Sequence, residues 1–279
     1  MKKLTALLLA ILLCTACIAA LTACGESSPY NNVTIKETTL VDEKGILAVA
    51  KRFGKYDSDT LSAECALIID ITNNSDKTVS FSLINMAVNG CVLDDSVGIV
   101  LEPGSTQTLP AALDETKLEN YGIKTVADLE FCASVLNDKT YEDIVVTDPI
   151  TIKTSAYEGF NYEYDESGTV MYDADGVKIV IKDGLIKDDF FGSYVNLYVV
   201  NQTDKTIDVS VVQGKVNGKT AQITAGSYTP PGKRNISILS MDEKDRPEQV
   251  DSFTLSFSVS DWDTGEVLVE KTEPVTVKF

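Results

Sequence analysis

A short polar turn between two apolar runs occurs twice in this chain, and this repetition constrains the fold more than any other feature. The first copy is Asn73-Asn74-Ser75-Asp76-Lys77-Thr78-Val79, and the second is Asn201-Gln202-Thr203-Asp204-Lys205-Thr206-Ile207. Further matches follow in the same order: Val88-Asn89-Gly90 with Val216-Asn217-Gly218, and residues 147–153 with 272–278. Ordered matches of this kind predict a tandem duplication of one structural unit.

Each copy has the pattern of β-structure. Phe253, Leu255, Phe257 and Val259 alternate with polar residues, which gives a strand one buried face and one solvated face. Asn-Gly and Pro-Gly pairs supply the turns between such runs. Roughly seven or eight short strands in each copy predict a β-sandwich.

The repeat divides the chain into two β-sandwich domains, residues 33–154 and 170–279, with 155–169 as a linker or an edge strand. A short helix is expected at 114–121, where an acidic start is followed by Leu118 spaced to meet Tyr121. The second copy has 241–249 at this place, interrupted by Pro247.

The N-terminal segment has the pattern of a secretion signal. Lys2 and Lys3 precede an apolar run over 4–21, and Leu21-Thr22-Ala23-Cys24 resembles the lipobox of bacterial lipoproteins. We therefore expect a cleaved signal peptide at 1–23, a diacylglyceryl group on Cys24 and a flexible tether over 24–32. An uncleaved anchor helix is the alternative, because the apolar run is close to the roughly 20 residues that span a bilayer.

Charge and cysteines narrow the class of protein further. A net charge of −18 repels nucleic acid, so no nucleic-acid partner is expected. Besides Cys24, the exported part contains Cys65, Cys91 and Cys132, an odd number without counterparts in the second copy. A Cys65–Cys132 disulfide and buried free thiols both remain open at this point.

The lipobox, the tether, the repeated Asn-x-Ser/Thr-Asp-Lys-Thr turn and the Pro-Gly turn together resemble tandem immunoglobulin-like domains of surface lipoproteins in Gram-positive anaerobic bacteria. The resemblance covers about residues 33–279 and rests on turn signals, with no catalytic residue among them. It implies two immunoglobulin-like sandwiches on the outer face of the cell membrane, with a binding or interaction role.

The inventory of catalytic residue types is sparse. The chain has no histidine, which excludes Ser-His-Asp and Cys-His catalysis as they are usually built, and zinc motifs that use histidine. Acidic pairs remain at Asp94-Asp95, Asp188-Asp189 and Asp261/Asp263, and such pairs serve carboxylate-dependent hydrolases.

Two acidic turns place oxygen ligands as Ca²⁺ prefers, although neither completes an EF-hand. They hold Asp173 with Asp175, and Asp261 with Asp263. Turn chemistry alone explains the same residues, because Asp and Gly favour turns for backbone reasons. No other cofactor is expected.

Aromatic residues are the remaining candidates for ligand contact. Trp262 lies beside an expected hairpin turn, and Tyr157, Phe160, Tyr162 and Tyr164 lie among acids between the two copies. They form either a platform for a peptide or glycan or the apolar filling of the joint and the core.

The sequence therefore predicts a lipid-anchored, non-catalytic binding module of the cell envelope, with an envelope protein, peptide or glycan as partner. A structural spacer and a carboxylate-dependent hydrolase are the alternatives.

Overall fold

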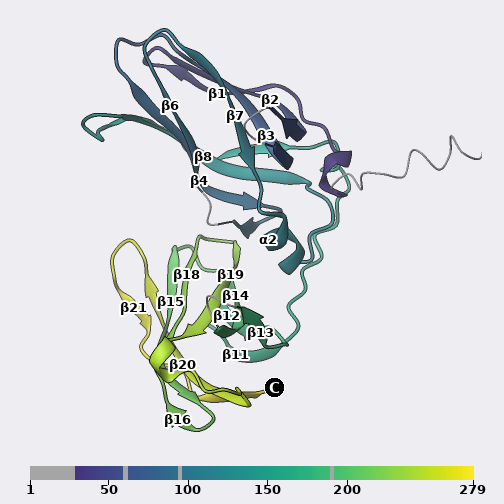
Figure 1. The fold of residues 1–279 in the computed structure, drawn as a ribbon, viewed down its shortest axis with the longest axis vertical. Coiled ribbons are helices and arrows are strands. Elements are labelled where there is room, and N and C mark those ends of the chain that lie inside the picture. The colour runs from purple at the N-terminus through teal and green to yellow at the C-terminus, as the bar shows by residue number, and fades with distance from the viewer. Residues whose placement is uncertain (1–28, 59–61, 94–95, 189–191) are drawn as a thin grey trace, which may run out of the picture.

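A computed structural model describes residues 29–58, 62–93, 96–188 and 192–279 (Figure 1). The signal segment 1–23, Cys24, the tether to residue 28, Asp94-Asp95 and Asp189 lie outside the described residues. Strands dominate the described part, so the prediction of an all-β chain is confirmed.

The first half of the chain contains two sheets. Its strands are β1 (Thr38–Glu43), β2 (Ile46–Asp57), β3 (Ser62–Asn73), β4 (Val79–Val88), β5 (Cys91–Val92), β6 (Val97–Leu101), β7 (Thr106–Ala112), β8 (Asp128–Asn137), β9 (Asp143–Val146) and β10 (Ile150–Lys153). One sheet has the order β1-β2-β3-β7. In the other, β4 pairs with β5, β6 and β8, and β8 also pairs with β9 and β10.

The second half repeats this pairing scheme. Its strands are β11 (Thr169–Ala174), β12 (Val177–Ile181), β13 (Ile186–Asp188), β14 (Gly192–Asn201), β15 (Ile207–Val216), β16 (Lys219–Thr220), β17 (Ile223–Thr224), β18 (Gly226–Thr229), β19 (Arg234–Met241), β20 (Ser252–Asp261), β21 (Val267–Val269) and β22 (Val275–Lys278). β11-β12-β14-β19 corresponds to β1-β2-β3-β7, with β13 and β17 added at β14 and β19. β15 pairs with β16, β18 and β20, and β20 pairs with β21 and β22.

A hydrophobic core lies between the two sheets of each half. In β4, Val79, Phe81 and Leu83 are fully buried while Ser80 and Ser82 between them are half-exposed. In β20, Phe253, Leu255, Phe257 and Val259 are buried in the same way. The period of two predicted from the sequence therefore places every second side chain in a core.

The turns follow the chemistry expected of them. Asn89-Gly90 and Asn217-Gly218 both have positive φ at their two residues, with φ of 51° and 76° in the first pair and 49° and 78° in the second. This is the type I′ geometry that suits a two-residue hairpin, and Asn and Gly adopt it at little cost. The turns thereby set the register of β4 with β5 and of β15 with β16.

The three helices of the described residues are short. They are η1 (Pro29–Asn32), α2 (Glu115–Asn120) and η2 (Glu243–Asp245). α2 confirms the predicted helix: the Asp114 side chain caps it by accepting from the Lys117 N–H at 3.1 Å, and Leu118 is fully buried. None of these helices is long and apolar enough to cross a membrane.

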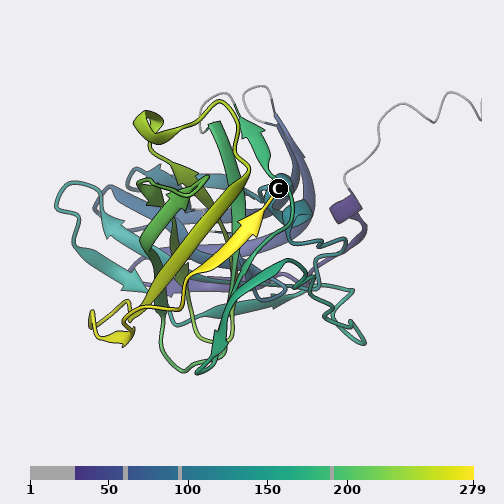
Figure 2. The ribbon, with the colours of Figure 1, turned by 90° about the horizontal axis from the view of Figure 1, so that it is seen from below.

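The two halves meet through strand pairing and apolar contact. β5 lies parallel to β19, with Cys91 opposite Arg234, so a single sheet path continues from β4 of the first half into β14 of the second. Val180, Tyr198, Val200 and Ile236 of the second half belong to the apolar core cluster of the first. Figures 1 and 2 show the halves stacked with the linking segment along one side.

Candidate functional site

The segment between the halves forms one wall of a pocket. Residues 155–168 contain no strand, and we call them the linker. Within it Phe160, Tyr162 and Tyr164 are half-buried while Asn161, Glu163 and Asp165 are exposed. An extended chain places alternate residues on opposite sides, so one side of the linker packs against the protein.

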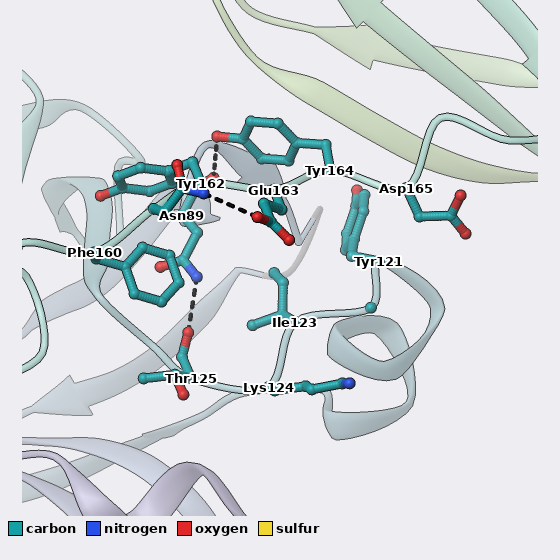
Figure 3. Close-up of a pocket in the computed structure, with 12 residues that line it drawn as sticks. Asn89, Tyr121, Ile123, Lys124, Thr125, Phe160, Tyr162, Glu163, Tyr164 and Asp165 are labelled. Carbon is teal, nitrogen blue, oxygen red and sulfur yellow. Dashed lines mark hydrogen bonds between the residues drawn. The ribbon is translucent and has the colours of Figure 1, made fainter.

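The pocket has a volume of about 420 Å³ and opens between this linker and the α2–β8 loop (Figure 3). The loop contributes Tyr121, Gly122, Ile123, Lys124 and Thr125, and the linker contributes residues 160–165. Asn89, from the β4–β5 turn, completes the lining. Three of the aromatic residues singled out in the sequence thus meet at one place.

Hydrogen bonds hold the linker tyrosines in place. The Tyr162 hydroxyl donates to the Asp128 carboxylate, and the Tyr164 hydroxyl donates to the Asn89 carbonyl at 3.0 Å. Burial and the hydrogen bond to Asp128 raise the pKa of Tyr162 above its usual value. The Phe160 and Tyr162 rings meet edge to face with centroids 4.9 Å apart. Phe160 has no hydroxyl, so its side chain forms no hydrogen bond and contributes to this wall through packing.

Asn89 anchors the floor of the pocket. Its side-chain oxygen accepts from the Ala127 N–H at 2.8 Å and the Asp128 N–H at 3.2 Å, and its amide donates to the Thr125 carbonyl at 2.8 Å. The residue is 4% exposed. It therefore fixes the α2–β8 loop against the hairpin from which it comes, and we expected only a turn role for it from the sequence.

Ionic contacts fix the end of the linker. The Arg234 guanidinium lies 3.4 Å from the centroid of the Tyr164 ring, and its Nε lies 3.7 Å from the Glu166 carboxylate. Glu166 also pairs with Lys178 at 2.9 Å, and Asp165 pairs with Lys182 at 3.0 Å. Hydrogen bonds from Ser167, together with Lys182, lower the pKa of Asp165 to about 2.

The other two aromatic candidates lie elsewhere. Tyr157 lines a different pocket of about 520 Å³, between the segment 34–38 and β10, where the Lys153 Nζ lies 4.0 Å from its ring centroid. Trp262 is 56% exposed at the β20–β21 turn and meets Tyr228 edge to face with centroids 5.3 Å apart. The five aromatic residues therefore do not form one platform.

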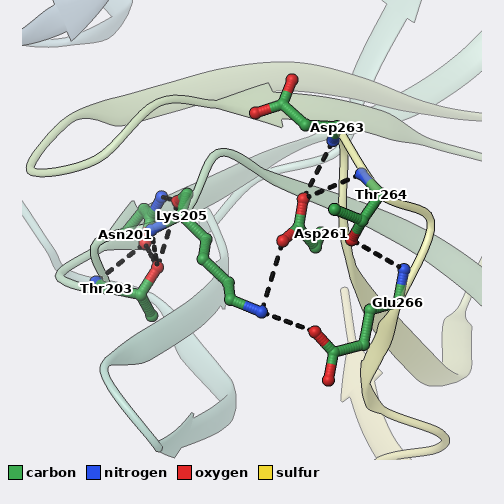
Figure 4. Close-up of polar contacts among 7 residues, drawn as sticks. All are labelled: Asn201, Thr203, Lys205, Asp261, Asp263, Thr264 and Glu266. Atoms are coloured by element: carbon green, nitrogen blue, oxygen red, sulfur yellow. Dashed lines mark hydrogen bonds and ion pairs between the residues drawn. The ribbon is translucent and has the colours of Figure 1, made fainter.

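Of the acidic candidates, Asp188 is the last residue of β13, and Asp261 and Asp263 lie at the β20–β21 turn. The Asp261 carboxylate accepts from the N–H groups of Asp263 and Thr264 at 2.9 and 3.2 Å and lies 3.3 Å from the Lys205 Nζ (Figure 4). Burial opposes ionisation of Asp261, but the N–H groups of Thr264 and Asp263 and the Lys205 ammonium lower its pKa overall. The Asp263 carboxylate points away from this network in Figure 4.

Asp173 and Asp175 lie at the β11–β12 hairpin, where Asp175 accepts from the Tyr172 hydroxyl at 2.7 Å. Over the described residues, no group of three or more Cys, Asp or Glu side chains converges as a metal site would require. The Ca²⁺ hypothesis for Asp173, Asp175, Asp261 and Asp263 stays a prediction.

All three described cysteines are free thiols. The structure therefore favours free thiols over the alternative of a Cys65–Cys132 disulfide. Cys65 and Cys91 are buried and Cys132 is half-exposed. Burial raises the pKa of both Cys65 and Cys91 to about 12, and it also raises the pKa of Cys132. A thiol with a raised pKa is a poor nucleophile at neutral pH.

Comparison with known proteins adds little. No protein-family model matches the sequence, and no curated protein matches it. Among solved structures, a complex of the exo-chitosanase CsxA of Amycolatopsis orientalis with PNP-β-D-glucosamine is similar at 13% identity and a TM-score of 0.22. The match covers 77% of this chain and 25% of the exo-chitosanase chain, and at this TM-score it carries no argument.

Proposed function

We propose that this protein is a lipid-anchored module of the cell envelope, built of two immunoglobulin-like sandwiches, that binds a partner without catalysis. The proposal combines the lipobox-like sequence before Cys24 with the repeated strand pairing of the two halves. The partner would be an envelope protein, a peptide or a glycan on the outer face of the membrane.

The observation that carries the binding role is the pocket beside Phe160. Its walls come from three separate segments, and the hydrogen bonds of Asn89, Tyr162 and Tyr164 fix these segments before any ligand arrives. A preformed pocket avoids the entropic cost of ordering loops on binding. Aromatic side chains beside amide and carboxylate groups suit a peptide or a sugar, since both offer apolar surface and hydrogen-bonding groups.

The binding role can be tested with purified protein immobilised through its N-terminal end and exposed to solubilised envelope extract. We expect the wild-type protein to retain a component that Phe160→Ala loses and that the control Tyr157→Ala, in the other pocket, keeps. Failure of the wild-type protein to retain anything at any ionic strength would contradict the proposal.

The proposed attachment to the membrane has a separate test. Cells expressing the wild-type protein and Cys24→Ser are fed an alkyne-bearing fatty acid, and the protein is then isolated. We expect label on the wild-type protein only, and recovery of Cys24→Ser outside the membrane fraction. An unlabelled wild-type protein would remove the lipid anchor from the proposal.

A structural spacer is the second candidate. The contact between the halves, which we call the joint, favours it. Parallel pairing of β5 with β19 and the shared apolar cluster resist bending between the halves, as a spacer requires. A spacer needs no pocket. It therefore predicts that Phe160→Ala, if folded, leaves every interaction of the protein unchanged.

A further inference from the structure

A second surface of the molecule combines the exposed Trp262 ring and the half-buried Tyr228 ring with an acid that has no basic partner among the described residues. It lies on the outer face of the sheet formed by β15, β18 and β20. In the antiparallel register, Asp208 of β15 lies between Tyr228 of β18 and Ser260 of β20. The Tyr228 and Trp262 rings meet edge to face with centroids 5.3 Å apart, and the backbone N–H of Trp262 donates to the Thr206 carbonyl at 2.9 Å. The backbone bond fixes the start of the turn, the Trp262 ring packs against Tyr228, and the residue is 56% exposed.

The acid at this surface, Asp208, differs from the nearby Asp261 in its ion pairing. Asp208 is half-buried, and its carboxylate accepts from the Ser210 hydroxyl at 2.7 Å. Among the described residues, no Lys or Arg forms an ion pair with Asp208, whereas Asp261 nearby is paired with Lys205. A half-buried carboxylate without a counter-ion gains more from an arriving cation than a fully solvated one, because less water competes.

A crevice between the two halves adjoins Tyr228. It has a volume of about 200 Å³, and Tyr228, Pro230, Pro149, Phe131 and Val92 supply its apolar lining. Its polar lining includes Glu130 and Lys233, which pair with each other at 2.6 Å. Tyr228 thus contacts Trp262 and also contributes to the lining of the crevice.

We propose that this aromatic-acidic face binds a lysine- or arginine-bearing extended segment of a partner protein. The cation of the partner would lie against the Trp262 and Tyr228 rings with Asp208 as its counter-ion, and a neighbouring apolar residue would enter the crevice. Cations are attracted to the faces of aromatic rings, most strongly to Trp, and a desolvated carboxylate adds to this. The net charge of −18 draws basic partners toward the protein over a longer range.

The position of this face in the molecule would leave it accessible to a partner protein. The β20–β21 hairpin lies on the opposite side of the molecule from η1, the first described element, in both Figures 1 and 2. If the N-terminal end is attached to the membrane as proposed, this hairpin faces away from it. The inference rests on the proposed binding role but uses a surface separate from the Phe160 pocket.

Trp262 provides the test, because it is the only tryptophan of the sequence and its fluorescence reports on this face directly. We would titrate the protein with an oligolysine peptide and with an oligoglutamate peptide of the same length. Oligolysine is expected to change the Trp262 emission with saturation, and oligoglutamate to leave it unchanged. Calorimetry would give the affinity independently of the fluorescence.

Two matched variants separate a site from general charge attraction. Asp208→Asn should weaken oligolysine binding by about tenfold, since charged hydrogen bonds contribute roughly that much. Asp42→Asn removes the same charge from an exposed hairpin of the first half and should change the affinity by less than about twofold. Trp262→Ala, followed by calorimetry, should weaken binding about as much as Asp208→Asn.

Equal effects of Asp208→Asn and Asp42→Asn would overturn the inference, and so would oligolysine binding that leaves Trp262 emission unchanged. If envelope extract yields a partner whose retention depends on Phe160 while oligolysine does not bind, this inference fails and the proposed binding role stands. If the extract yields a partner whose retention depends on Asp208 but not on Phe160, and oligolysine binds with the predicted dependence on Asp208, the Phe160 pocket fails and the aromatic-acidic face stands.

Discussion

Asn73 and Asn201 explain why the same turn occurs twice. Each side-chain amide donates to two carbonyls, of Lys77 and Leu101 at 2.8 and 3.1 Å in the first half, and of Lys205 and Thr229 at 2.8 Å each in the second. Each side-chain oxygen accepts from the residue two positions later, Ser75 or Thr203. Both asparagines are fully buried. One residue thereby ties a turn to a strand remote in sequence.

Replacing the buried amide with a carboxylate should be costly. Asn73→Asp removes both N–H donors and places a negative charge against two carbonyl oxygens, so we expect the free energy of unfolding to fall by about 2–5 kcal/mol. Denaturant unfolding at neutral pH measures this change in the free energy of unfolding. The control Asn74→Asp changes the exposed neighbour and should cost less than about 0.5 kcal/mol. A small and equal effect of both variants would contradict the role given to Asn73.

The sequence predicted these asparagines as turn residues but not as tertiary links. Asn is common in turns because its side chain bonds to the local backbone, and the contacts to Ser75 and Lys77 are of that local kind. The bond to the Leu101 carbonyl is different, since it depends on β6 returning beside β4. Such a contact is set by the fold and cannot be predicted from the spacing of residues in one turn.

At the scale of elements, the strands and turns agree with the prediction from the sequence, whereas the sequence did not predict the joint between the halves. Alternation and Asn-Gly turns are local patterns, and they predicted the β-structure and the hairpins. The joint depends on the outer face of the sheet β11-β12-β14-β19, where Tyr198 lies between Val180 and Ile236. The equivalent row of the first half is Val49, Asp70 and Thr108. Comparing the two copies residue by residue would have indicated which face is covered.

The linker meets this joint through Arg234 of β19. Arg234→Ala removes the cation from the Tyr164 ring and leaves Glu166 without that partner, so we expect a loss of about 1–3 kcal/mol in the free energy of unfolding. Thermal or denaturant unfolding measures it.

Arg234→Lys is the informative control for this contact. A lysine keeps the charge near Glu166 but loses the flat guanidinium that stacks on Tyr164, so an intermediate loss is expected. A full recovery by lysine would show that charge alone matters at this position, contrary to the stacking role.

The contacts of Asp165 with Ser167 and Lys182 give the linker a dependence on pH. Hydrogen bonds from Ser167 and the Lys182 ammonium lower the pKa of Asp165 from 3.8 to about 2. A depressed pKa stabilises the folded protein above the unfolded-state pKa, and this contribution is lost as the pH falls through about 2. Asp165→Asn should therefore lower the melting temperature slightly at neutral pH and have a clearly smaller effect near pH 2, as followed by circular dichroism.

A double-mutant cycle with Lys182→Gln checks this assignment. Because the two side chains are 3.0 Å apart, part of the effect of Asp165→Asn should disappear in the Lys182→Gln background. Strict additivity of the two substitutions at neutral pH would show that the pair does not stabilise the linker.

At the scale of the whole molecule, the two copies differ where their surroundings differ. Tyr198, Val200 and Ile236 of the second half are buried against the first half, whereas their equivalents Asp70, Thr72 and Thr108 are polar and at least partly exposed. Stacked repeats need such a polar outer face at the end of an array. The polar outer face of the first half is therefore of the kind that ends a stack, whereas the equivalent face of the second half is covered by the first.

A shared interface of this kind should make the halves unfold together. Separating them would expose the apolar row Val180, Tyr198, Val200 and Ile236, and each fully buried large apolar side chain contributes about 1.5–3 kcal/mol. Trp262 reports on the second half alone, while far-ultraviolet circular dichroism reports on the strands of both halves. In a denaturant titration the two signals should give the same midpoint, as a single cooperative transition requires.

Tyr198→Ser should lower that common midpoint, because it weakens the interface between the halves. The control Thr72→Ser, on the polar outer face of the first half, should leave the midpoint nearly unchanged. Two midpoints in the wild-type protein would mean that the halves are independent domains, and the parallel pairing of β5 with β19 would then contribute little to stability.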